Sequence, residues 1–183
     1  WLNAYALFGE SGVWPRGLPL EFLRSANEGI VERAAETCEA PIQQGLANGS
    51  PDVDAIWRLV SERQIEFAVR APITLDAGTW CPFNSQSTWW FREAFPLIYL
   101  PSFVTFRMTD IWRSFVAQRC LWEIDRGIAF VGPEVFQDRN EHNLLRDFEQ
   151  EIPGYLNNER IRVCLESLSL DRGPTAIFGN FRA

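Results

Sequence analysis

One carboxylate stands inside an otherwise apolar and aromatic stretch of this 183-residue chain. In the segment FRMTDIWRSFVAQ (residues 106–118), Asp110 lies between Arg107 and Arg113. A carboxylate that opens a buried helix and faces a cleft can take a proton from a hydroxyl, so Asp110 is a candidate catalytic base. Arg107 or Arg113 would hold it in its charged form or grip a phosphate. The alternative is structural, because a negative charge in the first turn stabilises a helix by about 0.3–1 kcal/mol.

A pair of acids occurs in SPDVDA, where Asp52 and Asp54 have the D-x-D spacing. Two carboxylates on one loop can bridge a divalent cation that holds a nucleotide diphosphate. An aspartate that follows proline also caps turns by accepting hydrogen bonds from the nearby backbone. The spacing alone leaves both interpretations open.

Other isolated polar and aromatic residues carry weaker indications. Arg16 in WPRGLPL could bind a phosphate or pair with a core acid. Asn84 in PFNSQ could bind a sugar hydroxyl, since its amide both donates and accepts, or it could be a satisfied loop amide. The rings of Trp89 and Trp90 are expected to pack within the protein, and the alternative is a surface on which a sugar stacks. His142, the single histidine, is expected on the surface, with a metal or pyrophosphate role as the alternative.

The composition excludes several classes of protein. A formal net charge of -7 argues against general nucleic-acid binding, which needs a basic field. No apolar run of about 18 residues is present, so the sequence predicts no membrane span. The four cysteines (Cys38, Cys81, Cys120 and Cys164) lie far apart, and with one histidine this argues against a zinc site. Free buried thiols and long-range disulfides both remain open.

The size and the order of elements predict one mixed domain. The length fits a single compact domain, and the opening WLNAYALFGE resembles folded interior, which suggests a fragment of something longer. Short strands mixed with helices indicate an α/β or α+β fold. Strands are expected at residues 65–69 and within 126–136, and turns between short strands at residues 6–22.

The helical pattern is strongest in the second half of the chain. Residues 110–123 are apolar nearly all round, which is typical of a buried helix, and Thr109 is expected as its N-cap. Residues 55–60 could form a helical turn or a short strand. From residue 140 onward, helical spacing occurs in two pieces that Pro153 and Gly154 separate.

Several of these segments occur in the same order in one family. VWPRGLPLEF, GLANGSPDVDAIWRL and PFNSQSTWWFREAFPLIYLPSFVTFRMTDIWRSFVAQ resemble the STELLO-type glycosyltransferase-like proteins, which are Golgi proteins in plants. A fainter likeness extends to the reversibly glycosylated polypeptides, the UDP-arabinopyranose mutases, which share an R-G-x-P turn, a P-D-x-D-A loop and an acidic D-[IM]-W helix start. The resemblance covers roughly residues 14–148.

The resemblance implies a mixed α/β fold, namely the acceptor-side half of a GT-A-like glycosyltransferase, with a short mixed sheet flanked by helices. Residues 1–183 would be a single domain or fragment that forms the C-terminal part of that fold. The implied activity is glycosyl transfer from a nucleotide sugar to an unknown glycan or protein acceptor, with Asp110 as catalytic base. The implied substrate-binding residues are Arg16, Asp52, Asp54, Asn84, Trp112 and Arg113, with Trp112 as a wall beside Asp110.

The resemblance also implies what lies elsewhere. Asp52 and Asp54 match a later P-D-x-D-A loop of the family rather than its metal motif, so Mn²⁺ or Mg²⁺ with a UDP-sugar would be bound by residues outside this chain. The mutases carry a histidine shortly after the strand that matches IAFVGPEVF, where this chain has Gln137 and Asp138. This departure argues against the hypothesis that the chain is a metal-dependent mutase.

Two functions therefore stay open at this point. The first is a nucleotide-sugar-dependent glycosyltransferase in the Golgi lumen. The second is a non-catalytic glycosyltransferase-like interaction or scaffold module with a protein partner in a glycan-synthesis complex. A sugar-binding domain that uses exposed rings is a more distant third.

Overall fold

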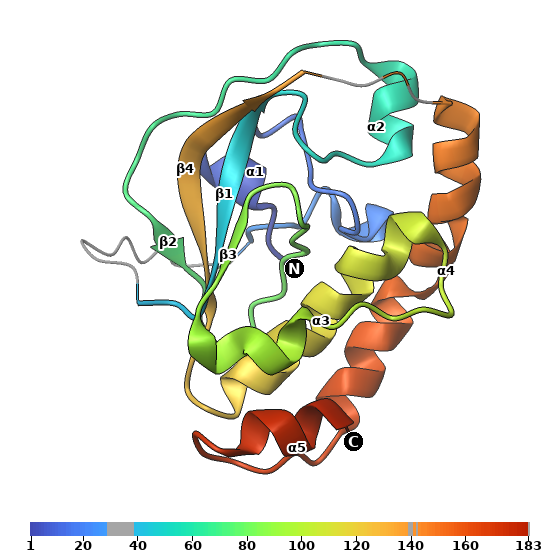
Figure 1. Cartoon of the computed structure of the whole chain (residues 1–183). Helices are drawn as coiled ribbons and strands as arrows, with labels where there is room; N and C mark the ends of the chain where they lie inside the picture. Colours follow the sequence, from blue (N-terminus) through green and yellow to red (C-terminus); the bar gives the residue numbers. More distant parts are fainter. Residues whose placement is uncertain (29–38, 139–140, 142, 183) are drawn as a thin grey trace.

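The centre of the molecule is a four-stranded mixed sheet with the strand order β2-β4-β1-β3 (Figure 1). The computed structural model describes residues 1–28, 39–138, 141 and 143–182. In the middle of the sheet, β1 (Ile42–Gly49) and β4 (Ile128–Gln137) run parallel. At its edges, β2 (Ile73–Thr74) and β3 (Thr88–Trp90) pair antiparallel to their neighbours. The predicted α/β class, with a short mixed sheet flanked by helices, is confirmed.

The strand β1 was not predicted from the sequence. Its residues, IQQGLANG, include two glycines and an asparagine, which are depleted in strands. Hydrogen bonding to both β3 and β4 and burial of most of its length compensate for that low propensity. The register between β1 and β4 shifts on both sides of Leu46, which lies opposite Pro133. Proline has no N–H to donate, so the ladder is interrupted there.

The strand predicted at residues 65–69 is absent, and that prediction is wrong. Ile65 forms an isolated bridge with Gly49, and no further ladder of the described residues extends it. Ile65 and Phe67 are buried in the main hydrophobic cluster, while Glu66 and Val69 are exposed, so the segment alternates like a strand without pairing along its length. The segment at residues 55–60 is helical and forms α2 (Ala55–Val60).

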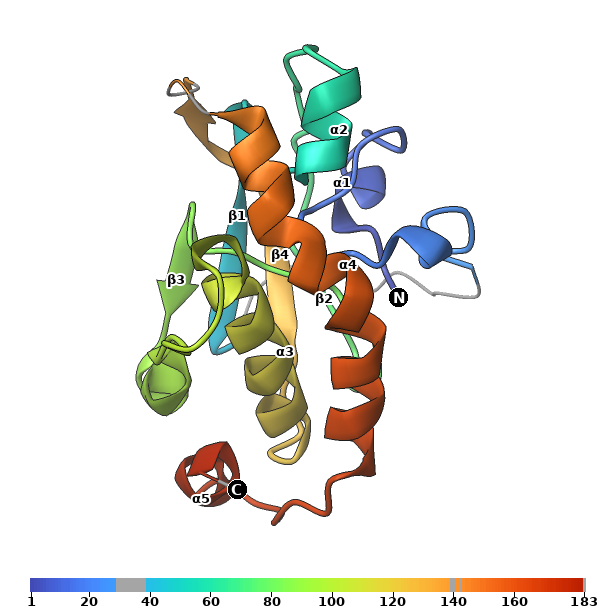
Figure 2. The ribbon, with the colours of Figure 1, turned by 90° about the vertical axis from the view of Figure 1, so that its right-hand side faces the viewer.

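The helix α3 (Thr109–Trp122) is buried on several sides, as predicted. Ala117, Cys120 and Leu121 belong to the same hydrophobic cluster as residues of the sheet. Ile111 and Phe115 belong to a second cluster, which includes side chains of α4 (Leu144–Ser167). The helices α3 and α4 lie side by side (Figure 2).

Thr109 is not the N-cap of α3, so that prediction is wrong. The short 3₁₀ helix η3 (Phe106–Met108) leads directly into α3, and Thr109 is the first α-helical residue. The Thr109 hydroxyl donates to the carbonyl of Phe106 at 2.9 Å. The predicted position of Asp110 in the first turn is confirmed.

The helix α4 is one continuous element of 24 residues, which corrects the expectation of two pieces. Pro153 lies inside it and removes one N–H of the helix ladder. At Gly154, an added Cβ would lie 2.6 Å from Cε of Met108. The glycine therefore lets α4 pack closely against η3, and this packing stabilises the helix across the proline.

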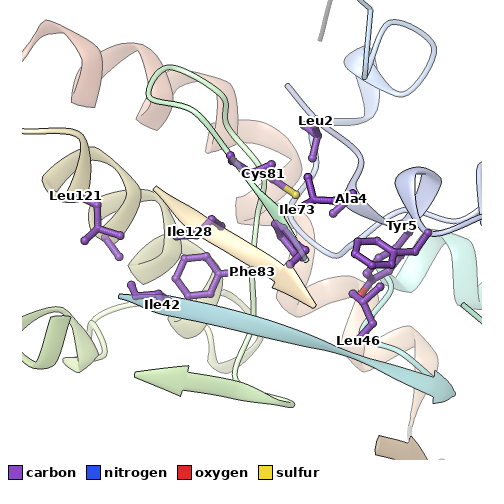
Figure 3. Packing of buried hydrophobic residues seen from close by; sticks show 14 of the residues in the cluster. Leu2, Ala4, Tyr5, Ile42, Leu46, Ile73, Cys81, Phe83, Leu121 and Ile128 are labelled. Atoms are coloured by element: carbon purple, nitrogen blue, oxygen red, sulfur yellow. The ribbon is translucent and has the colours of Figure 1, made fainter. Parts of the chain in front are cut away.

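The remaining elements complete the core. They are α1 (Ala4–Leu7), η1 (Leu20–Phe22), η2 (Arg92–Ile98) and α5 (Ala176–Arg182). Residues 6–22 were predicted as loop and turn between short strands. Turns are present there, together with the end of α1, η1 and one bridge between Pro15 and Val53, and the described chain has no strand on either side before β1. Figure 3 shows the main cluster, in which side chains of α1, β1, β2, β4 and α3 meet.

Three of the cysteines are free thiols. Cys81 and Cys120 are buried, and Cys164 is exposed. Burial raises the pKa of Cys81 to about 12 and that of Cys120 to about 11. Cys38 and His142 lie outside the described residues.

Candidate functional site

A polar cavity of about 250 Å³ lies where the Arg16 turn, the loop between β1 and α2, the Asn84 loop and the start of α3 meet. Most of its lining residues are charged, amide or hydroxyl side chains. They are Arg16, Ser50, Pro51, Asp52, Val53, Ala55, Arg58, Asn84, Gln86, Arg107, Asp110, Gln137 and Asp147. Five residues that the sequence singled out are thus brought together, namely Arg16, Asp52, Asn84, Arg107 and Asp110.

Arg16 joins the two carboxylates of the cavity. Its Nε donates to Oδ1 and Oδ2 of Asp52 at 3.0 and 3.1 Å, and its Nη2 donates to Asp52 Oδ2 at 2.7 Å. The same Nη2 lies 3.1 and 3.2 Å from the two oxygens of Asp110. Its Nη1 donates to the carbonyl of Arg107. Most of the donor capacity of Arg16 is therefore used within the protein, and pairing with acids describes it better than phosphate binding.

The turn that presents Arg16 depends on Gly17. The N–H of Leu18 donates to the carbonyl of Pro15 at 3.2 Å, and Gly17 has a φ of +95°. A positive φ at the third position is what a type II turn requires, and glycine adopts it without steric cost. The N–H of Arg16 also donates to the carbonyl of Asp52 at 3.1 Å. The backbone thus fixes the loop with Asp52 beside the turn.

A second ion pair lies behind the first. Arg107 donates through Nε and Nη2 to Oε1 of Glu151 at 2.8 and 2.6 Å. Glu151 is 1% exposed, and its Oε2 accepts from the N–H of Ala55 and the hydroxyl of Tyr155, each at 2.8 Å. The Nη2 of Arg107 lies 4.0 Å from Asp52 Oδ1. This network links α4 and the start of α2 to the cavity.

The network shifts the protonation equilibria of its members. Burial alone would raise the pKa of Asp52, but the charge and hydrogen bonds of Arg16, with the charges of Arg107 and Arg58, hold it below its usual value. For Arg16, burial lowers the pKa, and the charges of Asp52 and Asp110 outweigh burial and raise it. Both groups are therefore charged at neutral pH.

Asp110 is also the first member of a row of side chains along α3. Asp110, Ser114 and Gln118 are spaced four residues apart and share one face of the helix. Their oxygens accept hydrogen bonds from the N–H groups of Ser85 at 3.2 Å, Phe83 at 3.3 Å and Cys81 at 3.1 Å. The segment 81–85 is thereby fixed against α3, which positions Asn84 and Asp110 on the same cavity.

Asn84 is held by its own backbone and side-chain contacts. Its N–H donates to Oε1 of Gln44 at 3.0 Å, and its Oδ1 accepts from the N–H of Gln86 at 2.8 Å. Gln44 lies on β1 and also accepts from the hydroxyl of Thr88. The central strand thus defines the position of the Asn84 loop.

Three sequence-predicted substrate residues do not line the cavity. Asp54 is fully buried and caps α2, accepting from the N–H of Trp57 and from Nε1 of Trp14, both at 2.7 Å. Trp112 donates through Nε1 to Asn158 Oδ1 at 2.8 Å on α4. Arg113 lies over the ring of Trp90, with Cζ 4.7 Å from its centroid, and donates to the Ser85 hydroxyl at 3.0 Å.

Of the two interpretations of Asp54, capping of the backbone is therefore the one that the structure supports. Burial raises its pKa to about 6, and hydrogen bonds from Trp57 and Trp14 oppose that shift only in part. Arg113 has its pKa lowered by burial, and the charge of Asp110 opposes this. Both residues support the site from within the protein.

The contacts of the cavity decide whether its side chains could bind a divalent cation. Among the described residues, no group of three or more His, Cys, Asp or Glu side chains could hold a metal. Asp52 and Asp110 both turn their oxygens to the same guanidinium, which occupies the place that a cation would need. The two carboxylates that face Arg16 do not fit Mn²⁺ or Mg²⁺, and no step proposed below uses a metal held by this cavity.

Several residues of the site were missed in the sequence. Glu151 could not be found, since it lies 44 residues beyond Arg107 in a polar helix pattern. Ser114 and Gln118 carried a signal, because polar residues at i+4 and i+8 from Asp110 stand out in an apolar helix. Gln44 and Gln86 carried none, since they lie on an unpredicted strand and in a loop.

The fold and cavity describe a mixed α/β protein whose carboxylates and amides can hold a small polar ligand, and comparison with known proteins shows which family it resembles. A family profile described as STELLO glycosyltransferases matches residues 107–172. "Probable glycosyltransferase STELLO1" of Arabidopsis thaliana is 34% identical over 138 residues, which are 72% of this chain. "Probable glycosyltransferase STELLO2" of the same plant is 35% identical over 147 residues, or 76% of this chain. Over the matched residues the chain is similar to the STELLO-type proteins, so the resemblance that its motifs predicted is confirmed.

The matched region is a small part of those relatives. The alignments cover 18% of STELLO1 and 19% of STELLO2, so the chain spans about a fifth of the length of the curated relatives it matches. Among the helices of the described residues, none combines the length and the apolar character that crossing a bilayer requires.

Proposed function

We propose that this chain forms the acceptor side of a nucleotide-sugar-dependent glycosyltransferase with a GT-A-like fold. The observation that carries the proposal is the position of Asp110, whose carboxylate lines a polar cavity together with Asp52 and Asn84. The similarity to relatives named as glycosyltransferases supports the reaction class. The donor would be a sugar nucleotide such as a UDP-sugar, and the acceptor a glycan or protein hydroxyl.

In this proposal Asp110 is the general base. The acceptor hydroxyl attacks the anomeric carbon of the donor sugar, the bond from that carbon to the diphosphate breaks, and the hydroxyl proton passes to Asp110. A carboxylate has about four acceptor positions. Three contacts from Arg16 and Ser85 reach Asp110, so capacity remains for one hydroxyl. The same contacts fix the orientation of the carboxylate, which favours proton transfer.

Mn²⁺ or Mg²⁺ would neutralise the leaving diphosphate in such a reaction. We assign that role to residues outside this chain, because Arg16 occupies the carboxylates of the cavity. Localisation to the Golgi lumen is part of the proposal and is supported by the family resemblance alone.

The test is Asp110→Asn in the complete gene product, assayed for nucleoside diphosphate release from a panel of UDP-sugars with a glycan acceptor. Loss of a general base lowers turnover by about 10²–10⁴-fold. Asp171→Asn is the matched control, because Asp171 is exposed near α5 and does not line the cavity. Turnover of Asp110→Asn equal to that of the control would end the assignment.

A second candidate function is a non-catalytic interaction module, and one observation favours it. Large rings are exposed along residues 89–106, and Phe103 and Phe106 are 101% and 81% exposed. Exposed apolar side chains that form a contiguous patch mark surfaces that bind other macromolecules, and these rings would form such a surface if they lie together. A protein partner in a glycan-synthesis complex would fit such a surface.

The two functions predict opposite results in a complementation assay with the complete gene product. If the protein is a transferase, Asp110→Asn abolishes rescue of glycan synthesis, and the double variant Phe103→Ser, Phe106→Ser retains it. If the protein is an interaction module, Asp110→Asn rescues fully, and the double variant fails.

A further inference from the structure

The amide of Asn84 is almost fully buried and only partly used. The residue is 6% exposed and lines the cavity. Its Oδ1 accepts from the N–H of Gln86, which fixes the amide plane, and its Nδ2 makes no hydrogen bond within the described residues. Among the described residues, Nε of Arg113 is the fully buried side-chain atom without a hydrogen-bond partner. Nδ2 of Asn84 is therefore not fully enclosed, and Asn84 lines the cavity. In the free protein water can accept from this donor, and a bound molecule with an acceptor group can take the place of that water.

A second amide lines the same cavity. Gln86 also lines the cavity, and its Nε2 donates to the carbonyl of Ser50 at 3.1 Å. The side-chain oxygen of Gln86 is left as an acceptor. A hydroxyl can accept from Asn84 and donate to a neighbouring oxygen, whereas a phosphate at neutral pH mainly accepts.

The charges of the cavity disfavour an anion. Three arginines and three aspartates line it, and their formal charges cancel. The guanidinium of Arg16 faces Asp52 and Asp110, and that of Arg107 faces Glu151. Binding of a diphosphate requires cationic donors that are not already neutralised.

The volume restricts the ligand further. At about 250 Å³, the cavity lies below the range of ~300–1,000 Å³ that is typical of small-molecule sites. One sugar ring is of suitable size for the cavity, and the rest of a nucleotide sugar would extend beyond it.

We propose that this cavity is a subsite for one uncharged sugar ring, and that Asn84 recognises one of its hydroxyls through Nδ2. The proposal rests on the sugar-transfer function proposed above and states which part of the substrate this site takes. Asp110, on the same cavity, would then face a hydroxyl of that ring. The nucleotide diphosphate would be bound outside the cavity.

The experiment is titration of this chain with a panel of neutral monosaccharides and with inorganic pyrophosphate, followed by ligand-observed NMR. Asn84→Asp is the main variant, because it keeps the oxygen that accepts from Gln86 and removes the Nδ2 donor. Asn157→Asp is the matched control, since Asn157 lies on α4 and donates to the Pro153 carbonyl. Gln86→Met removes the neighbouring acceptor and gives a second variant should Asn84→Asp fail to fold.

We expect at least one sugar to bind with millimolar affinity and pyrophosphate to bind more weakly. Loss of one hydrogen bond in Asn84→Asp should weaken sugar binding about tenfold, with no change in Asn157→Asp. Tighter binding of pyrophosphate than of every sugar, absence of sugar binding, or equal sugar affinity in Asn84→Asp and the control would each overturn the proposal.

This result is independent of the transfer assay. If sugars do not bind but Asp110→Asn abolishes transfer, the subsite is wrong and the transferase stands. If sugars bind but Asp110→Asn leaves transfer unchanged, the subsite stands as a binding site and the catalytic assignment fails.

Discussion

Asp52 and Asp110, 58 positions apart in the chain, accept hydrogen bonds from the same nitrogen, Nη2 of Arg16, at 2.7 and 3.1 Å. Both carboxylates are 14% exposed, and Arg16 is 6% exposed. Two nearby acids with little solvent would repel each other without the guanidinium between them. Arg16 thus stabilises the arrangement that brings the loop with Asp52 to the start of α3.

Replacement of Arg16 should therefore be costly. Arg16→Ala leaves two buried carboxylates without their cation, and removing one partner of a buried ion pair costs about 3–5 kcal/mol. The free energy of unfolding from urea denaturation measures this loss. Arg16→Lys keeps the charge but not the planar fork, so it should be intermediate.

A double variant checks the cause of that loss. In Arg16→Ala, the further change Asp52→Asn removes one of the unpaired charges and should recover part of the stability. A double-mutant cycle with no coupling between the two positions would show that Arg16 stabilises the chain by packing alone.

Gly17 should be intolerant of any side chain. An added Cβ would lie 2.4 Å from Cγ2 of Ile111 and 3.1 Å from Cβ of Pro82, and the φ of +95° is itself unfavourable for other residues. Gly17→Ala should lose about 2–5 kcal/mol, from backbone strain of about 1–2 and overpacking of about 1–3 kcal/mol. Thermal and urea unfolding measure the change.

Gly78 gives the matched control for this prediction. It has a φ of +86°, and nothing lies within 4 Å of an added Cβ. Gly78→Ala therefore carries the backbone strain without the contact. Equal losses in the two variants would mean that the contact of Gly17 with α3 contributes nothing.

The sequence predicted the meeting of Arg16, Asp52, Asn84 and Asp110 because each stood in a short motif that matched a family pattern in order. It could not separate Asp52 from Asp54, since the two differ only in which way a loop turns. The backbone directs Asp52 to Arg16 and Asp54 to the N–H of Trp57. The spacing D-x-D contains no information on that direction.

Long-range pairing explains the other differences. The strand β1 forms although its residues have low strand propensity, because β3 and β4 bind both of its edges. The helix α4 continues through Pro153 because Gly154 lets it pack on Met108. Local propensity predicts neither result, since both depend on residues distant in the chain.

Trp112 should contribute to stability rather than to substrate binding. Its Nε1 donates to Asn158 Oδ1, and Nδ2 of Asn158 donates to the carbonyl of Gly17 at 2.8 Å. Trp112→Phe removes the first hydrogen bond while a ring remains in the second hydrophobic cluster. We expect a loss of about 1 kcal/mol in the free energy of unfolding.

The affinity of Trp112→Phe for monosaccharides should stay within twofold of that of the unaltered chain, since Trp112 does not line the cavity. A large loss of sugar affinity at unchanged stability would restore Trp112 to the binding site.

Asp54 should make the chain less stable at neutral pH than at mildly acidic pH. Its pKa is raised from 3.8 to about 6, with burial as the main cause. Between these values the folded state binds more protons than the unfolded state, so this group lowers the free energy of unfolding as pH rises through the window. The penalty is complete above pH 6 and, at 1.36 kcal/mol per pKa unit, amounts to about 3 kcal/mol.

Urea unfolding of the unaltered chain and of Asp54→Asn, which cannot ionise at position 54, should give free energies of unfolding that diverge progressively across this pH window. Asp171→Asn, an exposed control, should follow the unaltered chain. Parallel curves for the unaltered chain and Asp54→Asn would show that the carboxyl of Asp54 titrates with an ordinary pKa.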